Sequence, residues 1–173
     1  MSLVHTVSFP VMFACCVGMV TAIPAHAERI ISVDFTNAEL RVTDLDGVLF
    51  LHTQVVLPKG SYYEVPVQGT VRRAVMGPTW IPTPRTHIDM PGRFKEYYGP
   101  YEPGNAMGHC KVYIDFDRRD PSLQYVRIHG NARDHDLGKR LSRSCIRIPD
   151  EACPTLVELV AGYEGRVRVH FHE

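Results

Sequence analysis

The chain has 173 residues, enough for one domain with a short appendage, and its 19 Lys and Arg balance its 19 Asp and Glu. A formal charge of zero excludes an electrostatic binder of nucleic acid or of anionic membranes, because such binding needs an excess of basic residues. With 45% apolar and 22% charged residues, the composition is that of a folded globular protein.

The N-terminal segment has the layout of a secretory signal. An apolar run covers 7–23 and leads to Ala-His-Ala at 25–27, a small-x-small pattern, before the first acidic residue, Glu28. Proline and glycine interrupt the run, which makes it a poor spanning helix. We predict a signal peptide over 1–27, export to the periplasm or cell envelope, and a mature domain of 28–173 without an integral membrane segment. An uncleaved membrane or lipid anchor is the alternative.

Strand signals dominate the rest of the chain. The predicted strands cover 29–35, 39–43, 48–57, 68–76, 110–116, 125–129, 145–148 and 166–171. A proline-rich extended loop covers 77–84, and 85–109 reads as a long surface excursion without a helix. One helix is predicted from Asp150, as its N-cap, to about Ala161, and a short one near 137–141. The sequence therefore predicts a mostly β fold, a sandwich or barrel with one or two short helices.

Three cysteines remain in the predicted mature domain, Cys110, Cys145 and Cys153. An odd number in an exported protein leaves at least one thiol unpaired. Cys110 and Cys153 lie on apolar faces of a predicted strand and helix, which fits a place in the core. Whether these two pair is left open by the sequence.

Cys145 differs from the other two cysteines in its surroundings. On the predicted strand 145–148 it shares a face with Arg147, opposite two isoleucines. A nearby guanidinium favours thiolate over thiol, and the neutral imidazole of His129 could accept the proton. Cysteine plus histidine is a minimal set for acyl transfer through a thioester. A lone cysteine is more often a small buried apolar residue, and the sequence does not show that the two side chains meet.

A metal site is the weaker interpretation of the histidines and cysteines. Apart from an adjacent His-Cys pair at 109–110, the candidate ligands lack the close-pair spacing of metal sites. The candidates are His87, His109, Cys110, His129, His135 and Cys145. We expect no metal and no cofactor.

Two segments together resemble the signature of the L,D-transpeptidases, the YkuD domain family with a catalytic cysteine. They read RIHG at 127–130 and LGKRLSRSCIRI at 137–148. The family pattern is His-Gly, about a dozen residues, and then S-H-G-C followed by an aliphatic residue and Arg. The Pro-rich run at 78–84 and Met107-Gly108 before a strand add to the likeness, which covers most of 28–173.

The resemblance implies a YkuD-like β-sandwich or barrel and gives roles to particular residues. Cys145 would be the nucleophile and His129 its base, with backbone amides near Ser144 stabilising the oxyanion. Arg147 would attract a substrate carboxylate, for which a structural ion pair is the alternative, and Gly130 would serve the backbone geometry. Ser144 stands where the family has glycine, which is costly only if that position needs a positive φ. Arg143 stands where the family has a second histidine.

The implied activity is that of an exported transpeptidase acting on peptidoglycan stem peptides through a Cys145 thioester. It would form cross-links or exchange the terminal D-alanine. Two alternatives stay open. Water as acceptor would give an L,D-carboxypeptidase with the same site, and the altered pair at 143–144 could mark a catalytically inactive wall-binding member.

Overall fold

The computed structural model describes residues 28–60 and 62–173, so the predicted signal segment 1–27 lies outside the described residues. The strands are β1 (Arg29–Asp34), β2 (Glu39–Asp44), β3 (Leu49–Gln54), β4 (Leu57–Pro58), β5 (Val67–Met76), β6 (Cys110–Phe116), β7 (Arg127–Ala132), β8 (Arg140–Ser142), β9 (Ile146–Pro149) and β10 (Arg168–His172). The helices are α1 (Pro84–Asp89) and α2 (Cys153–Val160), with short 3-10 turns η1 (Pro121–Leu123), η2 (Asp134–Asp136) and η3 (Asp150–Ala152). None of the described helices is long and apolar enough to cross a membrane.

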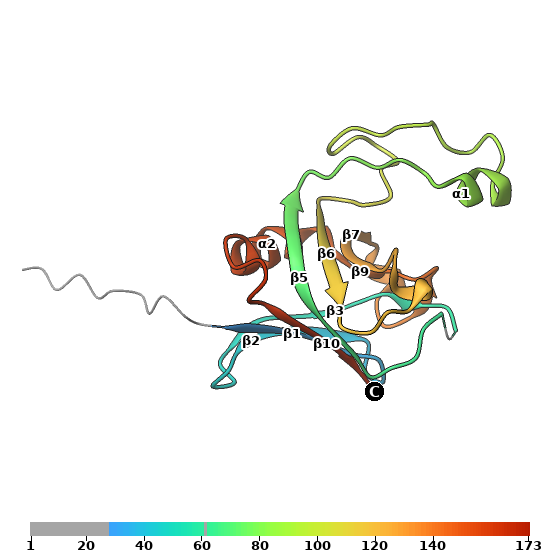
Figure 1. The fold of residues 1–173 in the computed structure, drawn as a ribbon. Coiled ribbons are helices and arrows are strands. Elements are labelled where there is room, and N and C mark those ends of the chain that lie inside the picture. The colour runs from blue at the N-terminus through green and yellow to red at the C-terminus, as the bar shows by residue number, and fades with distance from the viewer. Residues whose placement is uncertain (1–27, 61) are drawn as a thin grey trace, which may run out of the picture.

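One sheet carries the fold and almost closes on itself. Its strand order is β3-β2-β1-β10-β5-β6-β7-β9, and β4 pairs separately with β8. The two edges of the sheet meet where Val56, just after β3, exchanges backbone hydrogen bonds of 2.9 and 3.0 Å with Arg147 of β9. Figure 1 shows the strands wrapping around the core, with α1 and the 77–109 excursion standing above them. The predicted mostly β fold with one or two short helices is confirmed.

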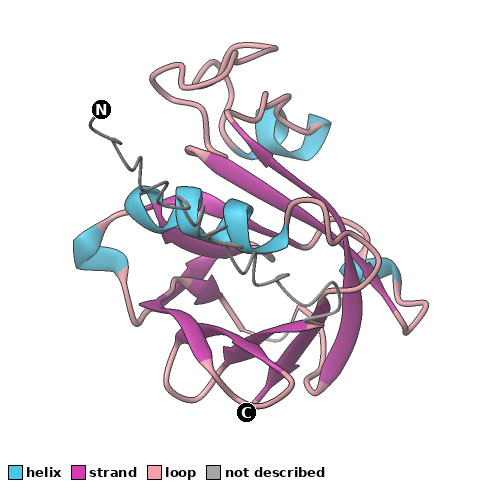
Figure 2. Cartoon of the chain, turned by 90° about the vertical axis from the view of Figure 1, so that its left-hand side faces the viewer, coloured by secondary structure: helices cyan, strands magenta, loops and turns pink. Residues whose placement is uncertain are grey.

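The core fills the inside of this curved sheet. Alternate residues of the strands point inward, as Ile31 and Val33 do on β1, and are fully buried. Helix α2 packs against β5 and β6 with Leu156 and Val160 fully buried, the face that its apolar spacing predicts. Figure 2 shows this helix lying across the strands.

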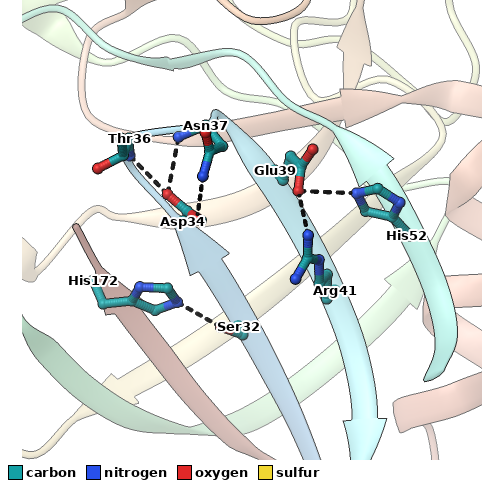
Figure 3. Close-up of polar contacts among 8 residues, drawn as sticks. All are labelled: Ser32, Asp34, Thr36, Asn37, Glu39, Arg41, His52 and His172. Atoms are coloured by element: carbon teal, nitrogen blue, oxygen red, sulfur yellow. Dashed lines mark hydrogen bonds and ion pairs between the residues drawn. The ribbon is translucent and has the colours of Figure 1, made fainter. Parts of the chain in front are cut away.

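Polar side chains of β1, β2, β3 and β10 contact one another (Figure 3). On β2, Glu39 forms an ion pair with Arg41 at 2.8 Å, and its carboxylate lies 3.1 Å from His52 Nε2 of β3. Between β1 and β10, the Ser32 hydroxyl and His172 Nε2 form a hydrogen bond of 2.7 Å. The first of these inter-strand contacts links β2 to β3, and the second links β1 to β10.

Two predicted elements are wrong in their details. The predicted strand 48–57 is broken, because Val55 and Val56 turn into the core between β3 and β4 and bond to other segments. The predicted short helix near 137–141 does not form. Gly138 takes a positive φ of 77° after η2, and the next residues pair with β4 as strand β8 instead.

The excursion contains a helix that the sequence analysis missed. At the start of α1 the Thr83 hydroxyl accepts a hydrogen bond from the Thr86 amide at 3.2 Å, and Pro84 occupies the first helical position. Trp80, which precedes the helix, exchanges backbone hydrogen bonds of 3.0 and 2.9 Å with Tyr98, which follows it. The Thr-Pro pair at 83–84 is the signal that could have predicted this helix.

A disulfide links the sheet to α2. Cys110, at the start of β6, bonds to Cys153, at the start of α2, across 43 positions of sequence, with the two Cα atoms 5.4 Å apart. Both residues are fully buried. The bond settles the pairing that the sequence left open, and it anchors the strand that lies beside β7.

Replacing both Cys110 and Cys153 by alanine is expected to lower the free energy of unfolding by about 2–4 kcal/mol, because a loop of this length is no longer closed in the unfolded chain. Denaturant unfolding would measure the change. Cys145→Ala, which removes a thiol outside the disulfide, is the control and should change it by less than about 1 kcal/mol. Equal stability of the double variant and the wild type would contradict this prediction.

Candidate active site

Three adjacent strands present one continuous face of polar side chains. The register pairs His129 of β7 with Lys111 of β6 and with Arg147 of β9, so these three side chains point to the same side of the sheet. Their neighbours Ile128 and Ile146 point to the other side and are fully buried in the core. The predicted orientation of the strand residues is therefore confirmed.

Cys145 lies just before β9 and extends the same face. The register places it beside Arg127, two residues before His129, so that Cys145 and His129 lie diagonally across neighbouring strands. It is half-buried and is the free cysteine of the described residues. No direct hydrogen bond joins Cys145 to His129 within 28–60 and 62–173. The thiol donates to the Tyr125 carbonyl at a sulfur–oxygen distance of 3.5 Å.

His129 lies inside β7, which continues to Ala132, and not at a strand end as predicted. Its Nδ1 is 2.8 Å from the Gly130 carbonyl oxygen. A carbonyl only accepts, so Nδ1 carries the proton and Nε2 is left as the acceptor. The side chain is only 3% exposed, and burial, then the positive charge of Arg147, lower the pKa of His129 to about 3. His129 is therefore a neutral base at physiological pH.

Gly130 is held in a tight junction with Asp150. The Asp150 carboxylate oxygen Oδ1 accepts hydrogen bonds from the backbone amides of His109 at 2.8 Å and Asn131 at 2.9 Å. A Cβ on Gly130 would lie 2.1 Å from that oxygen, and one on Gly108 would lie 2.3 Å from it. Only glycine fits at either position. The prediction that Asp150 caps the helix is wrong, because its carboxylate binds these two amides instead.

The backbone of the cysteine loop is fixed from both sides. The buried Ser142 hydroxyl donates to the Cys145 carbonyl, and the Tyr63 hydroxyl donates to the Ser144 carbonyl at 3.2 Å. Ser144 is not among the described residues with positive φ, so its side chain causes no backbone strain there. The position that the family fills with glycine therefore tolerates serine in this chain.

Burial raises the pKa of the Cys145 thiol above its ordinary value. The Arg127 amide, the Ser144 hydroxyl and the charges of Arg127 and Lys111 act in the opposite direction but do not outweigh it. The resting pair is therefore a neutral thiol and a neutral imidazole. Such a pair reacts when the base takes the thiol proton during attack.

Arg143 joins the cysteine loop to the excursion. Its guanidinium donates to the Thr86 hydroxyl at 3.2 Å and forms an ion pair with Asp89 at 3.0 Å, both on α1. Sequence reasoning treated Arg143 only as a departure from the family pattern. A contact across more than fifty positions leaves no local signal that could have predicted it.

The metal-ligand candidates do not come together. Cys110 forms a disulfide with Cys153 and is not available as a ligand. In the described part of the chain, no three His, Cys, Asp or Glu side chains are placed to hold a metal ion.

Comparison with curated proteins finds L,D-transpeptidases. The chain is 31% identical over 116 residues to the probable L,D-transpeptidase YbiS of Escherichia coli K12, covering 63% of this chain and 35% of that protein. It is 32% identical over 84 residues to the probable L,D-transpeptidase ErfK/SrfK of the same strain, covering 47% and 24%. The chain thus spans about a third or less of the length of these relatives. No family model matches it.

Solved structures share the fold. An L,D-transpeptidase from Mycobacterium smegmatis superposes with a TM-score of 0.60 at 15% identity, over 85% of this chain and 59% of that one. The catalytic domain of the Enterococcus faecium L,D-transpeptidase, acylated by ertapenem, gives 0.55 at 20% identity, over 84% of this chain and 98% of that one. The described residues therefore have the architecture of such a catalytic domain.

The raised pKa of the Cys145 thiol predicts slow alkylation at neutral pH. The rate constant with iodoacetamide, followed by mass spectrometry of the Cys145 peptide, is expected to rise about tenfold per pH unit from pH 7 to 9 without a plateau. Unfolded, non-reduced protein is the control and should level off near an ordinary thiol pKa of about 8.5. A plateau with a midpoint below pH 7 would show a preformed thiolate and contradict the prediction.

Arg143→Ala is expected to loosen α1 without unfolding the domain. The ion pair is partly exposed, so the free energy of unfolding should fall by less than about 1 kcal/mol. Backbone amide exchange in α1 should rise several-fold. Arg85→Ala is the matched control, since it removes the other ion pair of Asp89, at 2.8 Å, and leaves the cysteine loop attached. Equal exchange rates in the two variants would show that Arg143 does not hold the helix.

Proposed function

Because the chain belongs to the L,D-transpeptidase family by sequence similarity and by fold, we propose that 28–173 is an exported catalytic domain acting on peptidoglycan stem peptides. The proposal depends above all on one observation. A neutral, buried His129, whose Nδ1 is bound to the Gly130 carbonyl, lies on the same sheet face as the free thiol of Cys145. This is the donor–acceptor pair that thioester chemistry requires.

In the acylation step, the Cys145 thiol leaves the Tyr125 carbonyl and turns toward His129. Nε2 takes the thiol proton while sulfur attacks the carbonyl of an L-centre that is followed by a D-residue. The tetrahedral intermediate collapses as the carbon–nitrogen bond breaks. The imidazolium gives its proton to the leaving amine, so D-alanine departs and a thioester remains.

In the second step, an amine of another stem peptide attacks the thioester. His129 accepts the amine proton and returns it to the Cys145 sulfur as the carbon–sulfur bond breaks. His129 is therefore neutral at the start of each half-reaction. The depressed pKa keeps His129 unprotonated well below pH 6.5 but also makes it a weak base, so the thiol proton must move to Nε2 as sulfur attacks the carbonyl.

The remaining predicted residues would position substrate. Backbone amides around Ser144 and Cys145 would hold the oxyanion, and two hydrogen bonds to the carbonyls of that loop support a fixed geometry. Arg147 has no carboxylate partner within ion-pair distance in 28–60 and 62–173, which favours a substrate carboxylate over a structural ion pair. Gly130 would act indirectly, by keeping His129 in place.

Water as the acceptor would make the protein an L,D-carboxypeptidase. The two activities share the acyl-enzyme and differ only in the second step. The alternative of a catalytically inactive wall-binding protein is less well supported, because Ser144 does not take a positive φ and its backbone is unstrained.

The test mixes purified protein with a disaccharide-tetrapeptide and a D-amino acid and follows the products by mass spectrometry. Wild type is expected to exchange the terminal D-alanine, Cys145→Ala to lose exchange entirely, and His129→Gln to be about 10²–10⁴-fold slower. A carbapenem should add its mass to Cys145 in the wild type alone. Release of D-alanine without exchange would indicate a carboxypeptidase. No turnover and no adduct from folded protein would indicate a binding module.

A further inference from the structure

The face around Cys145 carries a cluster of cations. Lys111 and Arg127 are half-buried and flank the thiol, and both charges act on it. Neither has a carboxylate within 4 Å among the described residues. The Arg127 guanidinium donates to the carbonyl of its own neighbour Val126, at 2.6 Å. In a chain with equal numbers of acidic and basic residues, this is an uneven distribution.

An aromatic ring holds these cations in position. Lys111 Nζ lies 4.9 Å and Arg127 Cζ 5.2 Å from the centre of the Tyr113 ring, and Arg72 of β5 lies 5.4 Å from it. The Asp115 carboxylate lies 3.6 Å from Arg72 and pairs with this third cation of the cluster. Cation–π contacts orient a charge without neutralising it, so the hydrogen-bonding capacity of the cations stays available.

Burial is the main cause that lowers the pKa of Arg127, and the like charge of Arg72 adds to it. Cys145, Tyr113 and Asp115 act in the opposite direction but do not outweigh these two causes. Half-buried like charges in one cluster are unfavourable unless an opposite charge joins them. A hollow of about 580 Å³, lined by Arg72, Arg73, Tyr113 and Glu164, adjoins the cluster.

We propose that Lys111 and Arg127, held by Tyr113, bind free carboxylates of the acyl-donor peptide, so that this enzyme selects an acidic donor over its carboxamide. The inference rests on the proposed function. Adjacent strands lie about 4.8 Å apart and an extended peptide advances about 3.4 Å per residue. A donor whose carbonyl reaches Cys145 therefore places the groups within two residues of that carbonyl over these cations. A carboxylate there would form charge-assisted hydrogen bonds that a carboxamide cannot match.

The test uses full-length Cys145→Ala protein, which cannot turn substrate over, and calorimetry with two matched tetrapeptides. One carries free side-chain carboxylates beside the scissile bond and the other carries carboxamides. The free acid is expected to bind at least about tenfold more tightly, and added salt should reduce the difference. Arg127→Gln in the same background should shrink the preference to about twofold, and Arg127→Lys should restore part of it. Arg119→Gln, at an exposed arginine of the turn after β6, is the control and should keep the full preference.

Equal affinity for the two peptides, no binding of the free acid, or a preference that Arg127→Gln leaves intact would each overturn the proposal. Exchange assays with the wild type provide a further check. A preference for free carboxylates on the acceptor but not on the donor would overturn the proposal as well. Failure of the proposed function gives a different result. In that case Cys145→Ala still selects the acidic peptide, but the wild type forms no acyl-enzyme with it.

Discussion

The Asp150 carboxylate is the contact on which the position of the candidate base depends. One of its oxygens accepts the amides of His109 and Asn131, and it can reach them only because residues 108 and 130 lack a Cβ. The Cys110–Cys153 disulfide closes the same junction from the side of α2. His129 immediately precedes this junction, and its Nδ1 is bound to the Gly130 carbonyl. The tautomer that leaves Nε2 free is therefore set by backbone geometry, and no acidic side chain is needed to orient the ring.

Burial decides the protonation states of the two reacting groups. It lowers the pKa of His129 and raises that of Cys145, so both are neutral at rest. The cations on this face favour the charged thiolate and disfavour the charged imidazolium. Proton transfer from Cys145 to His129 therefore creates one charge that these cations stabilise, the thiolate, and one that they oppose, the imidazolium. A carboxylate bound by Lys111 and Arg127 would weaken both effects once the donor is in place.

The sequence predicted the parts of the fold that depend on alternation and on local turn signals. Strands β1, β2, β5 and β6 and the apolar face of α2 follow from their side-chain period, and Cys145 and His129 share a face as expected. Three of the failures share another cause, whereas the missed helix α1 had a local signal in the Thr-Pro pair at 83–84. Val55 and Val56 leave a strand-like run to close the sheet against β9, Asp150 binds amides distant in sequence, and Arg143 reaches α1. Each depends on a partner far along the chain, which no local pattern records.

The central claim is that His129 is a buried, neutral base with its proton on Nδ1. Nitrogen-detected NMR of the imidazole, with His129→Gln used to assign the signals, tests it directly. The account predicts the Nδ1–H tautomer and an unchanged shift from pH 8 down to about pH 4, because the pKa lies near 3. Titration near pH 6.5, or a proton on Nε2, would contradict it, since His129 would then be charged or unable to accept the Cys145 proton.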